Sequence, residues 1–212
     1  MPSGNVCAPQ DGYSIPVEVS IGSELAAGGR LFVGVVRDIS EQKRTEAELR
    51  LPLTGLLNRR AFNDEASRLT GLTLRHQRSL GVLVLDVDHF KRVNDTHGHA
   101  VGDEVLRQLA RTVSGELRDT DLLARLGGEE FCVLMPETGS DGLKRLANRL
   151  LEAVRAMVVR LPDVSLQITV SIGGANLRDP PDTFKQALLR ADEALYTAKG
   201  EGRNRVLIHG EA

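Results

Sequence analysis

The chain has 212 residues, of which 41% are hydrophobic, enough for one domain with a sizeable core and a smaller additional segment. Its 27 basic and 29 acidic residues leave a formal net charge of -2, which offers no basic surface for nucleic acid. Two cysteines are too few for a disulfide framework, no run approaches the roughly 20 apolar residues of a membrane span, and the N-terminus lacks the pattern of a signal peptide, so we expect a cytoplasmic protein.

The N-terminal part of the chain has a β pattern. Residues 14–21 alternate strictly between polar and apolar side chains, which predicts a half-buried strand with four aliphatic residues on one face: Ile15, Val17, Val19 and Ile21. A Gly28-Gly29 turn leads to a second predicted strand over 31–36, and capping residues then precede a helix over 42–50. We therefore expect a hairpin segment (1–37), a linker helix (38–50) and a main domain (51–212).

The main domain alternates between helical and extended patterns. Helices are predicted over 58–70, 99–117, 143–159 and 184–199, and strands over 80–87, 122–126, 131–135, 164–175 and 206–208. The two strands around Gly127 form a hairpin, and a hairpin requires antiparallel pairing. The predicted fold class is therefore α+β, or mixed α/β, with helices covering a central, mostly antiparallel sheet.

The tip of this hairpin carries two glycines and two carboxylates. Gly127 and Gly128 allow turn conformations and a close approach of the backbone to a ligand, and Glu129 and Glu130 follow directly. The alternative is an ordinary turn with a solvated acidic pair.

A second acidic group lies upstream, near the end of the apolar strand 82–87. Asp86 interrupts that strand, and a carboxylate in so apolar a setting needs a partner or a cation. Together with a hairpin glutamate on an adjacent strand, Asp86 would form an oxygen site suited to Mg²⁺. Lys91 follows where it could meet a phosphate, whereas the pair His97 and His99 lacks the further ligands of a zinc site.

Six segments, spread over roughly residues 50 to 208, resemble the GGDEF family of diguanylate cyclases. They occur in the order of the family: Leu53–Arg60, Asp86–Asp103, Gly127–Phe131, Ser171–Gly173, Ala191–Tyr196 and Ala198–Asn204. The resemblance implies a fold related to the palm of polymerases and nucleotide cyclases. It also implies that two GTP molecules are joined into cyclic di-GMP, with each ribose 3′-oxygen attacking the α-phosphate of the other GTP and pyrophosphate leaving.

The resemblance assigns roles to the acidic residues. Asp86, the backbone carbonyl of Val87 and Glu129 would hold Mg²⁺, with two ions per active site and Mn²⁺ as a substitute. Glu130 would assist deprotonation of the 3′-hydroxyl or complete the metal site, and the sequence leaves both roles open. Asp88 is expected to face away from this site and receives no role.

The resemblance also implies which residues contact GTP. The β- and γ-phosphates would meet the backbone amides near His89 and Phe90 and the side chains of Lys91, Lys199 and Arg203. Asn94 and Asp103 match the guanine-reading positions, and a carboxylate accepts from the N1 and N2 donors of guanine but repels the N1 acceptor of adenine. The alternatives are that Asp103 only favours the start of its helix and that Lys199 only favours the end of its helix.

A further short motif precedes the hairpin. Arg118 and Asp121 match the Arg-x-x-Asp inhibitory site of the family, where Arg118 would fork onto a phosphate or guanine edge of the product and Asp121 would accept from the base. Product inhibition away from the active site follows from this match. The alternative is a charged helix end followed by a turn.

The N-terminal segment and the linker carry two further expectations. Residues 14–43 resemble the last strands and the exit of a PAS sensor domain, and the alternative is an isolated hairpin. The family places an aspartate where Leu51 stands and has a longer helix before it, which puts the coupling to a sensor and the geometry of dimerisation in doubt. Two functions therefore remain: an active homodimeric diguanylate cyclase, or a catalytically silent module that binds GTP or cyclic di-GMP.

Overall fold

The protein divides into two compact units, Met1–Leu49 and Arg50–Ala212. The computed structural model describes residues 3–7, 14–26, 29–41, 48–162, 164–178 and 181–210. Most of the predicted linker helix, residues 42–47, lies outside these residues, as does Gly28 of the predicted turn.

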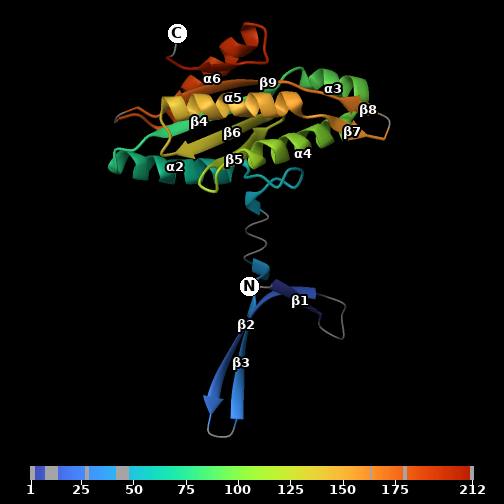
Figure 1. Ribbon diagram of the computed structural model, residues 1–212, viewed down its shortest axis with the longest axis vertical. Coiled ribbons are helices and arrows are strands. Elements are labelled where there is room, and N and C mark those ends of the chain that lie inside the picture. Colours follow the sequence, from blue (N-terminus) through green and yellow to red (C-terminus); the bar gives the residue numbers. More distant parts are fainter. Residues whose placement is uncertain are drawn as a thin grey trace. The chain divides into compact units, whose positions relative to one another are not determined.

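The first unit contains a three-stranded antiparallel sheet (Figure 1) with the order β1-β2-β3. Its strands are β1 Ser3–Cys7, β2 Ser14–Ala26 and β3 Gly29–Asp38. The predicted strand over 14–21 is therefore present and longer than expected. Its predicted half-burial is confirmed only at Val17 and Val19, because Ile15 is 42% exposed and Ile21 is 74% exposed, and Phe32 on the neighbouring strand is 65% exposed. The described part of this unit is a single sheet without a second layer to cover these side chains.

The second unit is built on a five-stranded sheet with the order β10-β9-β4-β6-β5, in which only the β10–β9 pair is parallel. The strands are β4 Leu80–Val87, β5 Leu122–Gly127, β6 Glu130–Pro136, β9 Val170–Asn176 and β10 Val206–Ile208. This arrangement confirms the predicted mixed fold with a mainly antiparallel sheet. The central strand β4 is buried along its whole length, which explains its nearly continuous apolar sequence.

Helices cover both faces of this sheet (Figure 1). On one face α4 (His99–Gly115) and α5 (Ser140–Ala156) pack against β4 side chains such as Leu83 and Leu85. On the other face α2 (Arg59–Arg75) and α6 (Phe184–Gly200) pack against the alternate positions of β4 and against Cys132, whose thiol is fully buried. Asp86 is two residues after Val84, and alternate residues of a strand point to the same face, so its position belongs to the face that α2 and α6 cover.

Helix α6 lies unusually close to strand β9. A Cβ added to Gly173 would lie 2.1 Å from the carbonyl oxygen of Ala191 and 2.3 Å from the backbone nitrogen of Leu195. Glycine at this position therefore lets the backbone of the helix rest on the strand. The close approach fixes the height of α6 above the sheet, and with it the position of Lys199 in the last turn.

Several predicted elements differ from the structure, and helix α2 ends at Arg75 rather than at residue 70. Helix α3 (Phe90–His97) was missed, although its residues lie within the Asp86–Asp103 match. The predicted strand over 164–175 is two strands, because β8 (Val164–Leu166) pairs with β7 (Val159–Leu161) in a separate hairpin and β9 begins only at Val170. Helix α5 ends at Ala156 rather than at residue 159, because Met157 is already extended and the chain then enters β7. No helix among the described residues is long and apolar enough to cross a membrane.

Candidate active site

The two predicted acidic elements meet at one end of the sheet. Asp86 lies directly opposite Glu130 in the antiparallel register of β4 and β6. The carbonyl of Glu129 accepts from the backbone N–H of Val87 at 3.4 Å, so the turn is joined to the end of β4. Gly127 and Gly128 form the turn with φ values of 152° and 50°. Residues that are more than 40 positions apart in the sequence therefore place three carboxylates beside one another.

Asp86 is 7% exposed and has one cation beside it. The ammonium Nζ of Lys199 lies 2.8 Å from Oδ2 of Asp86. Burial raises the pKa of the Asp86 carboxyl, the hydrogen bond and charge of Lys199 oppose that shift, and the negative charges of Glu129 and Asp88 add to it. Sequence reasoning assigned Lys199 to the phosphates of GTP, whereas in the structure it is the counter-ion of Asp86.

The donor set suits a hard divalent cation. Asp86, Glu129 and the Val87 carbonyl offer oxygen atoms only, and Mg²⁺ is usually held by one or two carboxylates together with substrate phosphates. Among the described residues no three acidic, imidazole or thiol groups converge on one point. The chain thus fits a metal that arrives with a phosphate ligand better than a metal held by the protein alone.

A short turn follows β4 and begins helix α3. His89 has left-handed backbone angles (φ 57°, ψ 28°) and precedes the helix, whose first residue, Phe90, is buried while Lys91 is exposed. A left-handed residue before a helix directs the first N–H groups of that helix to one side, where they can bind an anion. Arg203 also has a left-handed backbone conformation, with φ 62°, in the turn after α6.

Asp88 has a defined position that sequence reasoning did not anticipate. It is 6% exposed and accepts three hydrogen bonds: from Oγ1 of Thr169 at 2.6 Å, from Oγ of Ser171 at 2.7 Å and from the backbone N–H of Asn204 at 3.0 Å. Its carboxylate thus ties the turn before α3 to the start of β9 and to the residue after Arg203. A carboxylate directly after a buried strand was the only sign of this role in the sequence.

Asn94 and Asp103 lie on the neighbouring helices α3 and α4. A Cβ added to Gly102 would lie 1.9 Å from Oδ1 of Asn94, so the glycine before Asp103 leaves room for the Asn94 side chain between the two helices. Arg125 of β5 connects this corner to the hairpin, because its Nε donates to the Gly128 carbonyl at 2.8 Å. Burial lowers the pKa of the Arg125 guanidinium, and the negative charges of Asp103 and Glu129 partly restore it.

Two further charged residues surround Glu130, and the sequence motifs did not assign either of them. Nη2 of Arg59 at the start of α2 lies 4.0 Å from Oε2 of Glu130. The pKa of Asp192 on α6 is raised by desolvation and by the negative charge of Glu130. Glu130 therefore lies between a cation on one helix and an anion on the other.

Comparison with known proteins identifies this constellation. The family described as "Diguanylate cyclase, GGDEF domain" matches residues 52–205. The chain belongs to this family. The matched residues thus include strands β4, β5, β6 and β9 of the sheet and end directly before β10.

Curated relatives and solved structures agree with this assignment. Diguanylate cyclase DgcM of Escherichia coli (strain K12) is 40% identical over 205 residues, which cover 93% of this chain and 48% of that protein. Response regulator PleD of Caulobacter vibrioides (strain NA1000 / CB15N) is 40% identical over 157 residues, 73% of this chain and 35% of that protein. The chain therefore spans about half the length, or less, of these relatives.

Two crystal structures have the same fold as the GGDEF domain. The GGDEF domain of DgcB from Caulobacter crescentus, in complex with c-di-GMP, superposes with a TM-score of 0.74 at 34% identity, over 77% of this chain and 96% of that one. Diguanylate cyclase SiaD from Pseudomonas aeruginosa, in complex with its activator SiaC, gives a TM-score of 0.75 at 40% identity, over 79% and 64%.

The Arg-x-x-Asp motif of the GGDEF domain forms a closed turn before β5. The backbone N–H of Arg118 donates to Oδ2 of Asp121 at 3.0 Å, and the Asp121 N–H donates to the Arg118 carbonyl at 3.0 Å. Oδ1 of Asp121 is buried and has no hydrogen-bond partner among the described residues. Strand β5 separates this turn from the hairpin tip, a distance of roughly 17–20 Å for six extended residues.

The turn at Leu51 closes although the family aspartate is missing. The backbone N–H of Leu51 donates to the Leu56 carbonyl at 2.8 Å, and the Leu51 carbonyl accepts from Thr54 at 3.3 Å and from Gly55 at 2.8 Å. The hydroxyl of Thr54 is buried and has no partner among the described residues. The departure at residue 51 thus leaves the turn in place with one unsatisfied donor inside it.

Proposed function

We propose that the protein condenses two molecules of GTP into cyclic di-GMP with release of two pyrophosphates. The observation that carries this proposal is the placement of Asp86 directly opposite Glu130, with Glu129 at the hairpin tip, in a domain of the GGDEF family. The names of DgcM and of the cyclic di-GMP complex of DgcB support the same substrate and product class.

Each acidic residue has a task in this reaction. Asp86, the Val87 carbonyl and Glu129 would hold Mg²⁺, or Mn²⁺ as a substitute, which in pairs supplies charge neutralisation for the attacking and leaving oxygens. Glu130, about half exposed, faces the open side of the site, where it can accept the proton of an incoming 3′-hydroxyl. Arg59 and Asp192 hold that carboxylate between opposite charges.

Lys199 changes partner in this proposal. In the nucleotide-free protein its ammonium compensates the charge of Asp86. Arrival of a triphosphate with its cation replaces that compensation, and Lys199 is then free to contact the β- and γ-phosphates together with Lys91, Arg203 and the N–H groups near His89 and Phe90. The same side chain thus serves the empty and the loaded site.

The proposal extends to base selection and stoichiometry. Asn94 and Asp103 lie together at the α3–α4 corner, where a carboxylate favours the N1 and N2 donors of guanine. The hairpin glycines Gly127 and Gly128 leave open space beside the backbone for the nucleotide. Each domain would bind one GTP, and because each 3′-oxygen attacks the other nucleotide, the reaction requires two copies facing one another as a homodimer.

Regulation by product and by an N-terminal sensor is part of the proposal. Arg118 lines a hollow of about 350 Å³ together with Arg145 and the acidic residues Glu137 and Asp141. The two guanidinium groups of this hollow are available to a phosphate or guanine edge of cyclic di-GMP. Arg118→Ala is expected to relieve inhibition by added product, and an unchanged inhibition curve would contradict this role. The first unit would be the C-terminal fragment of a PAS domain.

The test is to incubate the purified chain with GTP and Mg²⁺ and to resolve the nucleotides. Cyclic di-GMP and pyrophosphate in a ratio of one to two support the cyclase, whereas unchanged bound GTP indicates the silent module. Glu130→Gln is expected to lower turnover by at least about 100-fold with the fold intact. Glu152→Gln, which changes an exposed glutamate on α5 outside the proposed catalytic and product-binding sites, is the matched control. Near-normal product from Glu130→Gln rules out the assignment.

A further inference from the structure

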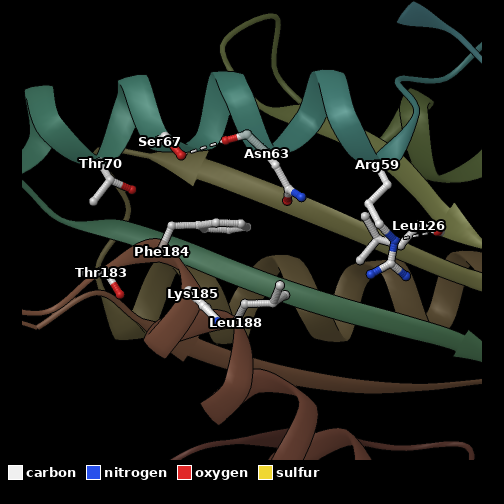
Figure 2. A pocket seen from close by; sticks show the side chains of 9 residues that line it. All are labelled: Arg59, Asn63, Ser67, Thr70, Leu126, Thr183, Phe184, Lys185 and Leu188. Atoms are coloured by element: carbon white, nitrogen blue, oxygen red, sulfur yellow. Dashed lines mark hydrogen bonds between the residues drawn. The ribbon is translucent and has the colours of Figure 1, made fainter.

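A groove runs between α2 and the first half of α6, beside the candidate active site. Figure 2 shows Asn63, Ser67 and Thr70 of α2 on one side and Phe184 and Leu188 of α6 on the other. Its volume is about 530 Å³, within the range of roughly 300–1,000 Å³ typical of sites for small organic ligands. Of its lining residues, only Arg59 has a role in the function proposed above, as a neighbour of Glu130.

The lining combines an apolar body with positive charge. Phe184, Leu126 and Leu188 provide apolar surface, and Phe184 is held in place by an edge-to-face contact with Phe62 whose ring centroids are 5.8 Å apart. The charged groups of the lining are Arg59 and Lys185, and no carboxylate lines the groove. Two cations without an acidic neighbour in the lining fit an organic anion rather than a cation or a neutral molecule.

Hydroxyl and amide groups along α2 complete the site. The Ser67 hydroxyl donates to the Asn63 carbonyl and the Thr70 hydroxyl to the Ala66 carbonyl, so both hydroxyls keep lone pairs for a ligand donor. The amide of Asn63 is exposed at the mouth of the groove. A few placed polar groups in a largely apolar cleft are characteristic of small-molecule sites.

Arg59 belongs both to this groove and to the surroundings of Glu130. Its Nε donates to the Leu126 carbonyl at 3.0 Å, the residue before the hairpin glycines, and its Nη2 lies 4.0 Å from Oε2 of Glu130. An anion that engages this guanidinium from the groove competes with Glu130 for it. Without Arg59, the negative charges of Asp86 and Asp192 near Glu130 are opposed by Lys199 but no longer by a cation on α2.

We propose that the α2–α6 groove is an effector site for a small organic anion with an apolar body. Such a ligand binds with its acidic group between Arg59 and Lys185 and lowers turnover by drawing Arg59 away from Glu130. The regulatory part rests on the proposed cyclase function, whereas the binding part does not.

The binding test uses 8-anilinonaphthalene-1-sulfonate, which has an aromatic body and one anionic group, with the full chain labelled at leucine methyls for NMR. Shifts at Leu126 and Leu188 are expected, and Lys185→Gln should weaken binding about fivefold through loss of one charge-assisted contact. Lys144→Gln on α5 is the control and should leave binding unchanged. N-phenyl-1-naphthylamine, which lacks the sulfonate, should bind more weakly and equally to the wild type and to Lys185→Gln.

Three outcomes overturn the binding proposal. The first is that the probe shifts only leucine signals of the first unit. The second is that the sulfonate binds wild type and Lys185→Gln with equal affinity. The third is that the Leu188 signal shifts with protein concentration in the absence of probe, which would mean that a second copy covers the groove. The regulatory part is tested separately: the sulfonate should lower the turnover of GTP, and Lys185→Gln, with normal basal turnover, should need about fivefold more of it. A failure of wild-type turnover would overturn the proposed function and leave the binding result standing.

Discussion

Lys199 and Asp86 form an ion pair that links the last turn of α6 to the end of β4, with Nζ 2.8 Å from Oδ2. The carboxylate is almost fully buried, while the lysine side chain is about one third exposed. The pair therefore compensates the charge of a carboxylate in an apolar strand, and Lys199 favours the ionised form of the group that we propose to bind Mg²⁺.

Lys199→Met is expected to destabilise the nucleotide-free protein at neutral pH by about 1–2 kcal/mol, less than for a fully buried pair because Lys199 is partly exposed. Burial, Glu129 and Asp88 all raise the pKa of Asp86, and the variant removes the one group that lowers it. A group whose pKa is raised in the folded state stabilises that state below its unfolded pKa, and this contribution is lost as pH rises. The difference in the free energy of unfolding between wild type and Lys199→Met should therefore shrink toward acidic pH. Urea unfolding at several pH values measures this.

The control for this variant is Lys91→Met, which changes an exposed lysine of the same site and should leave the free energy of unfolding nearly unchanged. Added Mg²⁺ should stabilise Lys199→Met more than wild type, because a cation replaces the lost ammonium. Equal stability of wild type and Lys199→Met at neutral pH would contradict the role of the ion pair.

Asp88 is expected to position the nucleotide-binding turns rather than to bind metal. Asp88→Ala removes acceptors for Thr169, Ser171 and Asn204 and should lower the free energy of unfolding by about 3 kcal/mol. The KM for GTP should rise, because the turn before α3 and the turn containing Arg203 lose their common anchor. The affinity for Mn²⁺, measured by electron paramagnetic resonance, should change little.

Thr169→Val serves as the graded comparison, because it removes one of the three donors and should cost about 1 kcal/mol. A large loss of Mn²⁺ affinity in Asp88→Ala with normal stability would show instead that Asp88 is a metal ligand.

The sequence predicted what depends on local pattern and motif. The apolar run of β4, interrupted by Asp86, and the glycine pair of the hairpin were sufficient to predict that Asp86 and a hairpin glutamate lie side by side. The strand register pairs Asp86 with Glu130. The partner of Lys199 and the three donors to Asp88 were not predictable, because each contact joins segments whose spacing is fixed only by the packing of α6 and β9 on the sheet. The missed helix α3 begins at a left-handed histidine rather than at a recognisable cap.

The ion pair of Asp182 and Arg190 is expected to make stability depend on pH. Asp182 is 8% exposed, its Oδ2 lies 2.5 Å from Nη2 of Arg190, and it also accepts from the Arg178 N–H at 2.7 Å. Burial opposes the ionised form, but these hydrogen bonds and the Arg190 charge together lower the pKa of Asp182. Its contribution is therefore present above the unfolded pKa of about 4 and is lost as pH falls through the folded pKa.

Asp182→Asn should accordingly cost about 1–3 kcal/mol at neutral pH, and the difference from wild type should narrow below about pH 4. Glu65→Gln is the matched control, because Glu65 pairs with Arg68 on the more exposed surface of α2 and should cost no more than about 0.5 kcal/mol. Unfolding followed by far-UV circular dichroism gives both values. A difference between wild type and Asp182→Asn that is the same at all pH values would contradict the assignment.

Leu51→Asp is expected to stabilise the domain by restoring an acceptor to the turn that precedes α2. The Thr54 hydroxyl is buried there without a partner among the described residues, and the Thr54 N–H makes only a long bond of 3.3 Å to the Leu51 carbonyl. A side-chain oxygen three residues before Thr54 has the spacing of a capping interaction, worth about 1 kcal/mol. Leu51→Asn should stabilise similarly, because the effect depends on the acceptor and not on the charge, whereas Leu51→Ala should not.

The gain in stability should disappear in a Thr54→Val background, because that variant removes the hydroxyl through which it acts, and a double-mutant cycle measures this coupling. A gain that survives Thr54→Val would contradict this interpretation. Destabilisation by both polar substitutions would show that Leu51 is kept for its packing.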